Sequence, residues 1–283
     1  MAHIRLGLIG DNIATSPSPE LHRVCGKLSG LAVTYDLLVP RNLNLDFDSV
    51  FDRAQKEGYR GLNITYPYKE TVVGRLAVDD ASIKAISACN TVVFERPRRR
   101  GANTDYTGFI GAYRRSYGTA SPGVVAMAGS GGVGKAVAFA LARLGAKALH
   151  LFDIERAKSE RLKQALAGVF PAIAVSIATS IEEACDGADG LINCTPLGME
   201  RIGGTAFPPG MLNRKRWAFD AVYTPVETEF IRDARGAGVE VMTGYELYFF
   251  QGVDAFRIFT GFDVDAAVLR KALQPSQTQQ VMA

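Results

Sequence analysis

A glycine-rich turn between an apolar strand and a helix of small residues constrains this chain more than any other feature. Residues 124–128 are Val-Val-Ala-Met-Ala, and glycine follows at positions 129, 131, 132 and 134. Gly129 permits a tight turn, Gly131 lets the backbone approach a pyrophosphate, and Gly134 lets helix and strand pack closely. The phosphates would then face the helix N-terminus. The run predicts a dinucleotide-binding turn, with a purely structural glycine turn as the alternative. The predicted cofactor contacts are Gly129, Ser130, Gly131, Gly132, Val133 and Gly134.

An acidic residue at the end of the next predicted strand bears on which dinucleotide binds. Asp153 follows Gly134 by nineteen positions, close to the spacing of about 20 that is typical of this motif. A carboxylate there accepts hydrogen bonds from both ribose hydroxyls of NAD and repels the 2′-phosphate of NADP. Arg156 and Lys158 are near enough to weaken that argument. We predict NAD, with NADP as the alternative, and count Asp153 and Arg156 among the cofactor contacts. A helix cap is the structural interpretation of Asp153.

Strand-like and helix-like runs alternate along the chain, and repeated β-α-β spacing favours a mostly parallel sheet. A chain of 283 residues is long for one core. We predict a two-domain α/β fold: a substrate-binding catalytic domain at 1–108, a Rossmann dinucleotide-binding domain at 109–242, and C-terminal helices at 243–283 with a polar tail from 275. The expected strands are 6–9, 33–39, 61–66, a hairpin at 90–103, 124–128, 148–152, 174–177, 190–193, 217–220 and 240–242. The expected helices are 19–30, 46–57, 69–76, 81–86, 107–117, 245–259 and 264–272.

The composition is that of an ordinary globular protein, with 47% hydrophobic and 22% charged residues and a formal net charge of +3. So small a charge does not indicate a nucleic-acid surface, and the basic run at 96–100 falls at the predicted hairpin tip. The four cysteines show no CxxC spacing, so no metal site is predicted. No apolar run reaches the roughly 20 residues that span a bilayer, and no signal peptide is visible. We therefore expect a cytoplasmic protein without nucleic-acid or membrane partners.

One lysine stands where a parallel sheet places its ligands. The segment 63–69 reads Asn-Ile-Thr-Tyr-Pro-Tyr-Lys, and its strand must end at Pro67, which cannot donate to a ladder. Because side chains alternate along a strand, Asn63 and Thr65 are expected on one face and Ile64 on the other. Lys69 follows beyond the carboxyl end of the strand, where α/β proteins bind ligands. A solvated loop lysine is the alternative.

A second polar loop follows a strand in the half of the chain that carries the glycine turn. Residues 191–199 read Leu-Ile-Asn-Cys-Thr-Pro-Leu-Gly-Met, a strand that stops at a Pro/Gly loop. This place suits contact with the nicotinamide side of the cofactor, and a plain turn is the alternative. Gly244, before the last long helix, is a predicted hinge. The contacts predicted here are Thr195, Leu197, Met199 and Gly244.

The order and spacing of several motifs resemble those of the shikimate dehydrogenase family. Four polar clusters precede the glycine run, at 16–22, 63–69, 90–93 and 103–108. Asn-Cys-Thr-Pro-Leu-Gly-Met at 193–199, Asp-Ala-Val-Tyr-Thr-Pro-Val-Glu-Thr at 220–228 and a helix carrying Gln251 follow it. The resemblance runs from about Leu6 to Gly261, and the motifs are jointly specific although each is common alone. It implies a substrate domain, a Rossmann domain and C-terminal helices that return to the first domain.

The resemblance also implies an activity, namely interconversion of shikimate and 3-dehydroshikimate with a nicotinamide cofactor. Ser16 and Ser18 would hold the substrate carboxylate with Tyr223 nearby, and Lys69 and Asp105 match the catalytic pair. Lys69 would lead the proton transfer while Asp105 orients it. Turn and helix-cap roles are the structural alternatives for the serines, the asparagines and Asp105. The residues expected to hydrogen-bond the ring hydroxyls are Asn63, Thr65, Asn90 and Gln251.

The run at 153–156, Asp-Ile-Glu-Arg, departs from the Asn-Arg-Ser/Thr run of NADP-dependent members and is similar to that of NAD-using branches, some of which accept quinate. Paired serines favour shikimate over quinate. The alternatives are a paralogue that acts on a related polyol or an aminoshikimate-type compound, and a weakly catalytic NAD sensor. Methylene-tetrahydrofolate dehydrogenase and glutamyl-tRNA reductase are less favoured, because their lysine and cysteine motifs are not visible. The chain is expected to be a monomer or homodimer.

Overall fold

The computed structural model describes residues 3–95 and 98–274 and divides into two compact units. The first unit comprises Met1–Asp79, Ala88–Thr104 and Gly252–Ala283, and the second comprises Asp80–Ser87 and Asp105–Gln251. The unit boundaries therefore fall at 79/80, 87/88, 104/105 and 251/252. The domains at 1–108, 109–242 and 243–283 stay predictions. Each unit has its own sheet.

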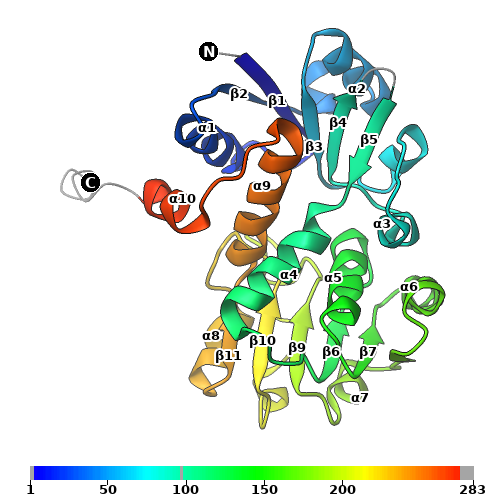
Figure 1. The fold of residues 1–283 in the computed structure, drawn as a ribbon. Helices are drawn as coiled ribbons and strands as arrows, with labels where there is room; N and C mark the ends of the chain where they lie inside the picture. Colours follow the sequence, from blue (N-terminus) through cyan, green and yellow to red (C-terminus); the bar gives the residue numbers. More distant parts are fainter. Residues whose placement is uncertain (1–2, 96–97, 275–283) are drawn as a thin grey trace. The chain divides into compact units, whose positions relative to one another are not determined.

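The first unit is built on a five-stranded mixed sheet with the order β2-β1-β3-β4-β5 (Figure 1). β1 pairs in parallel with β2 and β3, whereas β4 pairs antiparallel with β3 and β5. The predicted hairpin is the β4–β5 pair. Its basic tip at 96–97 lies outside the described residues. The strands are β1 (His3–Ile9), β2 (Ala32–Leu38), β3 (Gly61–Ile64), β4 (Thr91–Glu95) and β5 (Arg98–Ala102).

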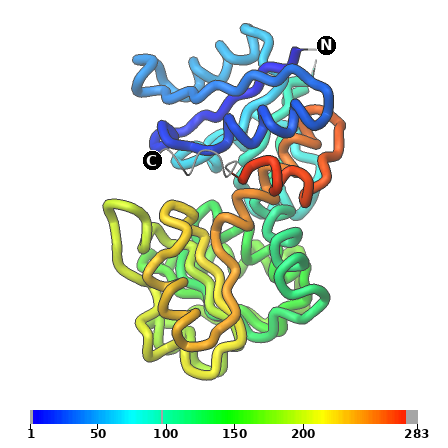
Figure 2. Tube along the Cα trace, turned by 90° about the vertical axis from the view of Figure 1, so that its left-hand side faces the viewer, coloured from blue at the N-terminus to red at the C-terminus, as the bar shows by residue number. Residues whose placement is uncertain are grey.

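The core of the first unit joins the sheet to the end of the last long helix. Phe259, on α9 (Gly244–Thr260), is fully buried against Leu6, Tyr35 and Val93. A Cβ atom at Gly61 would lie 2.5 Å from the Phe259 ring, so the helix can approach the strand this closely only at a glycine. The other helices of this unit are α1 (Ser18–Leu28), α2 (Phe47–Lys56), α10 (Ala266–Leu273) and the 3₁₀ segments η1 (Pro40–Leu43) and η2 (Thr71–Arg75). α10 packs beside α1 although the two are far apart in sequence (Figure 2).

The second unit is a six-stranded, fully parallel sheet with the order β11-β10-β9-β6-β7-β8. Its strands coincide with the predicted ranges: β6 (Val124–Ala128), β7 (Ala148–Phe152), β8 (Ala174–Ile177), β9 (Gly190–Asn193), β10 (Trp217–Asp220) and β11 (Glu240–Met242). Its helices are α3 (Ala81–Ile86), α4 (Thr104–Tyr117), α5 (Gly132–Arg143), α6 (Arg156–Val169), α7 (Ile181–Cys185), α8 (Glu229–Gly236) and the first part of α9, with the 3₁₀ turn η3 (Pro209–Met211).

Two predicted boundaries near the polar clusters were wrong. α4 begins at Thr104 and not at 107, so Asp105 lies in the first helical turn. β3 ends at Ile64 and not at 66, because Tyr68 N donates to Thr65 O (2.9 Å) and closes a turn there. The predicted helix at 69–76 is the shorter 3₁₀ segment η2. Within the described part of the chain, none of the helices is both long and apolar enough to cross a bilayer.

Candidate active site

In the first unit, the lysine segment is fixed by backbone hydrogen bonds on both sides of Lys69. Thr65 N donates to Ile9 O (2.9 Å), which extends the pairing with β1 beyond the end of β3. Cys89 N donates to the Lys69 carbonyl oxygen (2.8 Å), which ties the segment to the start of β4. Lys69 is half-buried. The sheet therefore places this lysine beyond the carboxyl end of a parallel strand, as its sequence position predicts.

The two serine hydroxyls lie together at the start of α1. Ser16 Oγ donates to Ser18 Oγ over 3.1 Å, and Ser18 N donates to Ser16 Oγ over 3.3 Å. The residue at the N-cap of α1 is Pro17, and no side chain caps this helix. The helix-cap alternative for the serines is therefore not what the structure contains. The two hydroxyls are half-buried and lie side by side, and a hydroxyl can turn its O–H toward a carboxylate oxygen.

A buried amide network joins β2, β3, β4 and the start of α4. Tyr35 Oη donates to Asn63 Oδ1 (2.9 Å), and Asn63 Nδ2 donates to Asn90 O and Thr91 Oγ1 (3.1 Å each). Asn90 Oδ1 accepts from Thr104 N at 2.7 Å and from the hydroxyls of Thr91 and Thr104 at 3.1 Å each. Asn63 and Asn90 are 6% and 3% exposed. These contacts hold both amides in one orientation, because reversing either would place like groups together.

Tyr35 is a site residue that sequence reasoning missed. It lies on β2, 28 positions before Asn63, and only the sheet brings the two together. His22 stacks on the Tyr35 ring with centroids 4.6 Å apart. Burial lowers the pKa of His22 to about 3, against a smaller opposing effect of its hydrogen bond with Asn63, so the imidazole is neutral. His22 therefore supports the amides through its stacking on Tyr35 and its hydrogen bond with Asn63.

The glycine-rich turn of the second unit has the room that a dinucleotide needs. Gly129 has φ of +95°, and its N–H donates to Phe152 O (2.8 Å). A Cβ atom at Gly134 would lie 2.2 Å from Gly129 O, so only glycine allows this approach of helix and turn. A Cβ atom at Gly131 would meet nothing within 4 Å, which leaves open space above the N-terminus of α5. The residues present therefore fit a pyrophosphate at this turn.

Asp153 supports the same turn. Its Oδ2 accepts from Ser130 N (2.7 Å), and its Oδ1 accepts from Glu155 N (2.9 Å). The N-cap of α6 is Glu155, so Asp153 is not the N-cap residue. The two nearby basic side chains form ion pairs with glutamates close to them in sequence. Arg156 pairs with Glu160 (3.1 Å), and Lys158 pairs with Glu155 (2.6 Å). Each carboxylate oxygen of Asp153 keeps capacity for a further donor.

A buried carboxylate organises the loops that follow β9 and β10. Asp220 Oδ1 accepts from Asn193 Nδ2 (2.9 Å) and Val222 N (3.0 Å), and Oδ2 accepts from Thr228 Oγ1 (2.7 Å). Asn193 Oδ1 in turn accepts from Thr195 N and its hydroxyl, while Asn193 Nδ2 donates to Leu197 O. The predicted loop residues Thr195 and Leu197 are thus held by one network. Met199 lies on the same loop and is 40% exposed.

Asp105, Tyr223 and Gln251 belong to the second unit. Asp105 is 6% exposed, and after desolvation its charge is the second cause that raises the pKa of Tyr223. Tyr223 stacks on Tyr248 with centroids 5.4 Å apart, and Gln251 Nε2 donates to Tyr248 O (2.9 Å). A Cβ atom at Gly108 would lie 2.6 Å from Gln251 N, so α4 and α9 touch at this glycine.

Gly244 is also a close-contact position, since its Cβ would lie 2.4 Å from Val222 O. Lys69, Ser16, Ser18, Asn63, Thr65 and Asn90 lie in the first unit, whereas Asp105 lies in the second. The pairing of Lys69 with Asp105 therefore stays a prediction. Among the described residues, no group of three or more His, Cys, Asp or Glu side chains could hold a metal ion.

Comparisons with known proteins give one consistent family. The model of the shikimate dehydrogenase substrate binding domain matches residues 8–92. A quinate/shikimate dehydrogenase (NAD⁺) of Corynebacterium efficiens is 38% identical, over 94% of this chain and 96% of the relative. A shikimate dehydrogenase (NADP⁺) of an Arthrobacter species is 37% identical, over 94% and 92%.

Solved structures give the same result. The structure of quinate dehydrogenase from Corynebacterium glutamicum in complex with NAD has a TM-score of 0.88 and 35% identity, covering 95% of this chain and 98% of that one. Shikimate 5-dehydrogenase from Thermus thermophilus, in complex with NADP(H) and shikimate, has a TM-score of 0.82 and 28% identity, covering 95% and 98%.

Two glycine variants separate structure from binding at the turn. We expect Gly131→Ala to leave stability within about 0.5 kcal/mol of wild type, because its Cβ enters open space, but to weaken NAD binding at least tenfold. Gly134→Ala should destabilise the second unit by about 1–3 kcal/mol, since its Cβ would clash with Gly129 O. Urea unfolding followed by the single tryptophan, Trp217, and calorimetric NAD titration measure both effects. Unchanged NAD affinity in Gly131→Ala would contradict the assigned pyrophosphate site.

Asp220 predicts a specific pH dependence of stability. Burial raises its pKa to about 6, against smaller opposing effects of its hydrogen bonds. Because the folded-state pKa lies above the unfolded value, protonation favours the folded state; this stabilisation is full below pH ~4 and is lost as pH rises through ~6. In Asp220→Asn the dependence should disappear. The wild-type unfolding free energy minus that of the variant should therefore fall by about 2 kcal/mol between pH 4 and 7.5. A constant difference across that range, measured through Trp217 fluorescence, would show that folding does not raise the pKa of Asp220.

Proposed function

Since the chain belongs to the shikimate dehydrogenase family, we propose that it interconverts shikimate and 3-dehydroshikimate, with NAD as the preferred nicotinamide cofactor. The observation that carries this proposal is the polar set of the first unit. Paired serine hydroxyls lie at the start of α1, two oriented amides join β3 to β4 and the start of α4, and one lysine follows β3. They match the carboxylate, the ring hydroxyls and the reacting hydroxyl of a polyhydroxy cyclohexene carboxylate.

In the proposed complex, each polar group of the first unit has a distinct task. Ser16 and Ser18 donate to the substrate carboxylate. Asn90 uses its Oδ1 within the protein, so its Nδ2 is the group assigned to a ring hydroxyl. Thr65 is assigned to a neighbouring hydroxyl, and Asn63, whose Nδ2 donates twice within the protein, is assigned to a hydroxyl through its Oδ1. Tyr223 and Gln251 are assigned to the carboxylate and a ring hydroxyl from the second unit.

The chemistry requires a hydride and a proton to leave one secondary alcohol. The nicotinamide cofactor supplies the hydride acceptor when bound. Lys69 Nζ is assigned to the reacting hydroxyl, where it takes the proton and stabilises the developing alkoxide. Asp105 orients the lysine and the hydroxyl. In the reductive direction Lys69 returns the proton to the carbonyl oxygen.

The preference for NAD rests on the charges around Asp153. Its carboxylate is fixed by two backbone N–H groups and faces the position assigned to the ribose. A 2′-phosphate placed there would meet like charge, which costs several kcal/mol. Arg156 and Lys158 are paired with glutamates and compensate less than their sequence proximity indicates. The cytoplasmic location and the monomeric or homodimeric state remain predictions.

A steady-state panel tests the proposal. Shikimate and quinate are each assayed with NAD and with NADP, and we expect shikimate with NAD to give the largest kcat/KM. Lys69→Ala should lower kcat about a thousandfold, because it removes the general acid–base group, while leaving NAD affinity within twofold of wild type. Lys27→Ala, at an exposed lysine of α1, is the matched control. Preference for NADP would overturn the role of Asp153. If none of the four assays shows turnover, the result would favour a related polyol or an aminoshikimate-type compound as the substrate, or a role as a sensor.

Tyr35→Phe tests the orientation of the Asn63 amide. The variant removes only the O–H that donates to Asn63 Oδ1, and we expect the KM for shikimate to rise about tenfold with a loss of about 1–1.5 kcal/mol in stability. Tyr59→Phe is the control, because Tyr59 is equally buried in the same unit and donates to Asp36 (2.6 Å). It should lose stability without a change in KM. Equal KM values in the two variants would remove Tyr35 from the substrate site.

A further inference from the structure

The lysine segment needs more than its own backbone to stay in place. Residues 65–70 contain no helix or strand, and the 3₁₀ segment η2 that follows ends at Arg75. A long flexible side chain such as that of Lys69 can meet a substrate atom reproducibly only if its backbone is held, since a 1 Å displacement of a reacting group can cost about 10²-fold in rate. The side chain of Arg75, at the end of η2, anchors this segment to a neighbouring helix.

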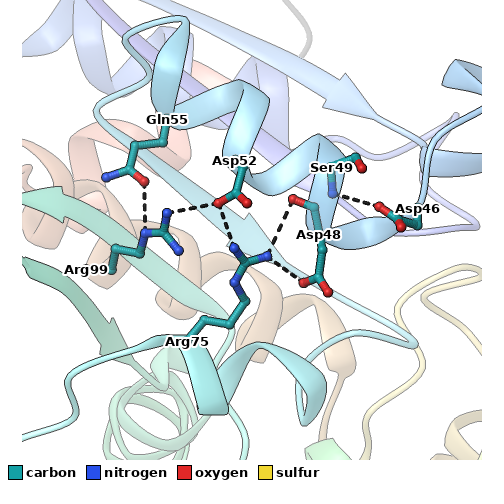
Figure 3. Close-up of polar contacts among 7 residues, drawn as sticks. All are labelled: Asp46, Asp48, Ser49, Asp52, Gln55, Arg75 and Arg99. Carbon is teal, nitrogen blue, oxygen red and sulfur yellow. Dashed lines mark hydrogen bonds and ion pairs between the residues drawn. The ribbon is translucent and has the colours of Figure 1, made fainter.

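Arg75 reaches from η2 to two consecutive turns of α2 (Figure 3). Its Nη1 donates to the carboxylate of Asp48, and its Nη2 donates to Asp52 Oδ1 (2.6 Å). The hydrogen bond from Arg75 is the main cause that lowers the pKa of Asp52, so this carboxylate stays ionised. The start of α2 is itself fixed, because Asp46 accepts from Ser49 N (2.7 Å). The guanidinium therefore binds a well-anchored helix.

A second arginine completes the cluster. Arg99 on β5 donates to the same Asp52 Oδ1 (2.9 Å) and to Gln55 Oε1 (2.8 Å), as Figure 3 also shows. Both guanidinium groups lie over the buried Phe51 ring, at 4.9 Å for Arg75 and 5.2 Å for Arg99. The two arginine side chains are only 22% and 28% exposed. The two arginines share the Asp52 carboxylate and the Phe51 ring, and both side chains are partly buried. These features distinguish the cluster from an ordinary surface ion pair.

α2 also holds the other side of the lysine. Phe47, its first residue, stacks on Tyr68 with centroids 4.7 Å apart. Tyr68 directly precedes Lys69, and its hydroxyl donates to Asp11 (2.8 Å). One helix therefore contacts the segment immediately before Lys69 and again at Arg75. Both contacts lie within the first unit.

The same residues border an open cleft of about 370 Å³, lined by Asp52, Gln55, Lys56, Arg75 and Arg99. An anion site would need cationic groups available to a ligand. Here both guanidinium groups are engaged by carboxylates of α2 and by Gln55. The geometry therefore favours a structural clamp over an anion site.

We propose that Arg75 is a positioning residue that holds the Lys69 segment against α2 through Asp48 and Asp52. The inference rests on the proposed role of Lys69 in proton transfer. Loss of the clamp would let η2 and the lysine backbone move while the dinucleotide turn, in the other unit, keeps its own contacts. The consequence is a defect in kcat without a defect in cofactor affinity.

The test compares Arg75→Gln with Arg53→Gln. Arg53 lies on the same helix, and it pairs with Glu57 (2.7 Å), the C-cap residue of that helix. We expect Arg75→Gln to lower kcat about tenfold with the Kd for NAD within twofold of wild type. Arg75→Lys should recover part of kcat, and Asp48→Asn, which removes the negative charge of one of the two partners, should lower it two- to threefold. Arg53→Gln should match wild type.

Hydrogen exchange separates this inference from the proposed function. Mass spectrometry of the peptide covering 65–76 should detect faster amide exchange in Arg75→Gln and unchanged exchange in Arg53→Gln. If wild type turns over none of the tested substrates, the proposed function fails while the exchange result still decides whether Arg75 holds the segment. If Arg75→Gln does not fold, Asp48→Asn carries the comparison. Wild-type kcat or wild-type exchange in the variants of the clamp would overturn the proposal.

Discussion

The carbonyl groups of Asn90 are the point on which the first unit's polar site depends. Its side-chain Oδ1 accepts three hydrogen bonds, two of them from Thr104, and its backbone oxygen accepts from Ile64 N (2.8 Å) and Asn63 Nδ2. One buried residue therefore binds both the last residue of β3 and the first residue of α4. Lys69 follows β3, and Asp105 follows Thr104, so each catalytic candidate lies close in sequence to a residue that Asn90 binds. An unsatisfied donor or acceptor here would cost about 1–3 kcal/mol, which discourages alternative arrangements.

In the second unit a carboxylate, that of Asp153, fixes the backbone near the candidate site, as the amide of Asn90 does in the first unit. Asp153 accepts two backbone N–H groups, one of them from the glycine-rich turn, before any ligand binds. The residue that we assign to the ribose therefore also stabilises the turn that we assign to the pyrophosphate. Substituting it would change the shape of the turn together with the cofactor preference. The consequence is that a simple exchange of Asp153 for a neutral residue does not isolate its electrostatic effect.

Sequence reasoning placed the strands of the second unit well and located the start of α4 poorly. Parallel strands buried on both faces are apolar runs between breakers, and the six ranges from 124–128 to 240–242 follow from that local signal. The start of α4 was wrong because Asn90, 14 positions earlier in the chain, satisfies the N–H of Thr104. Tyr35 and Arg75 were missed for the same reason: their partners are 23 to 28 positions away in sequence. The residue types in the sequence identified the side chains that can bind a ligand. The residues that fix those side chains in place are distant in sequence, and only the three-dimensional structure identified them.

This division has a physical cause. A side chain that binds a hydroxyl must present one fixed donor or acceptor, and an amide fixes its orientation only if its other atoms are already bonded. The side-chain oxygen of Asn90 accepts from Thr104 and Thr91. The amide of Asn63 is held by Tyr35 and Thr91. The backbone of Lys69 is held by Cys89 and by the contacts of α2. Each holding contact is made on folding and not on binding. The loss of conformational entropy on ordering these groups therefore occurs on folding and does not weaken substrate binding. More of the binding free energy can then stabilise the transition state.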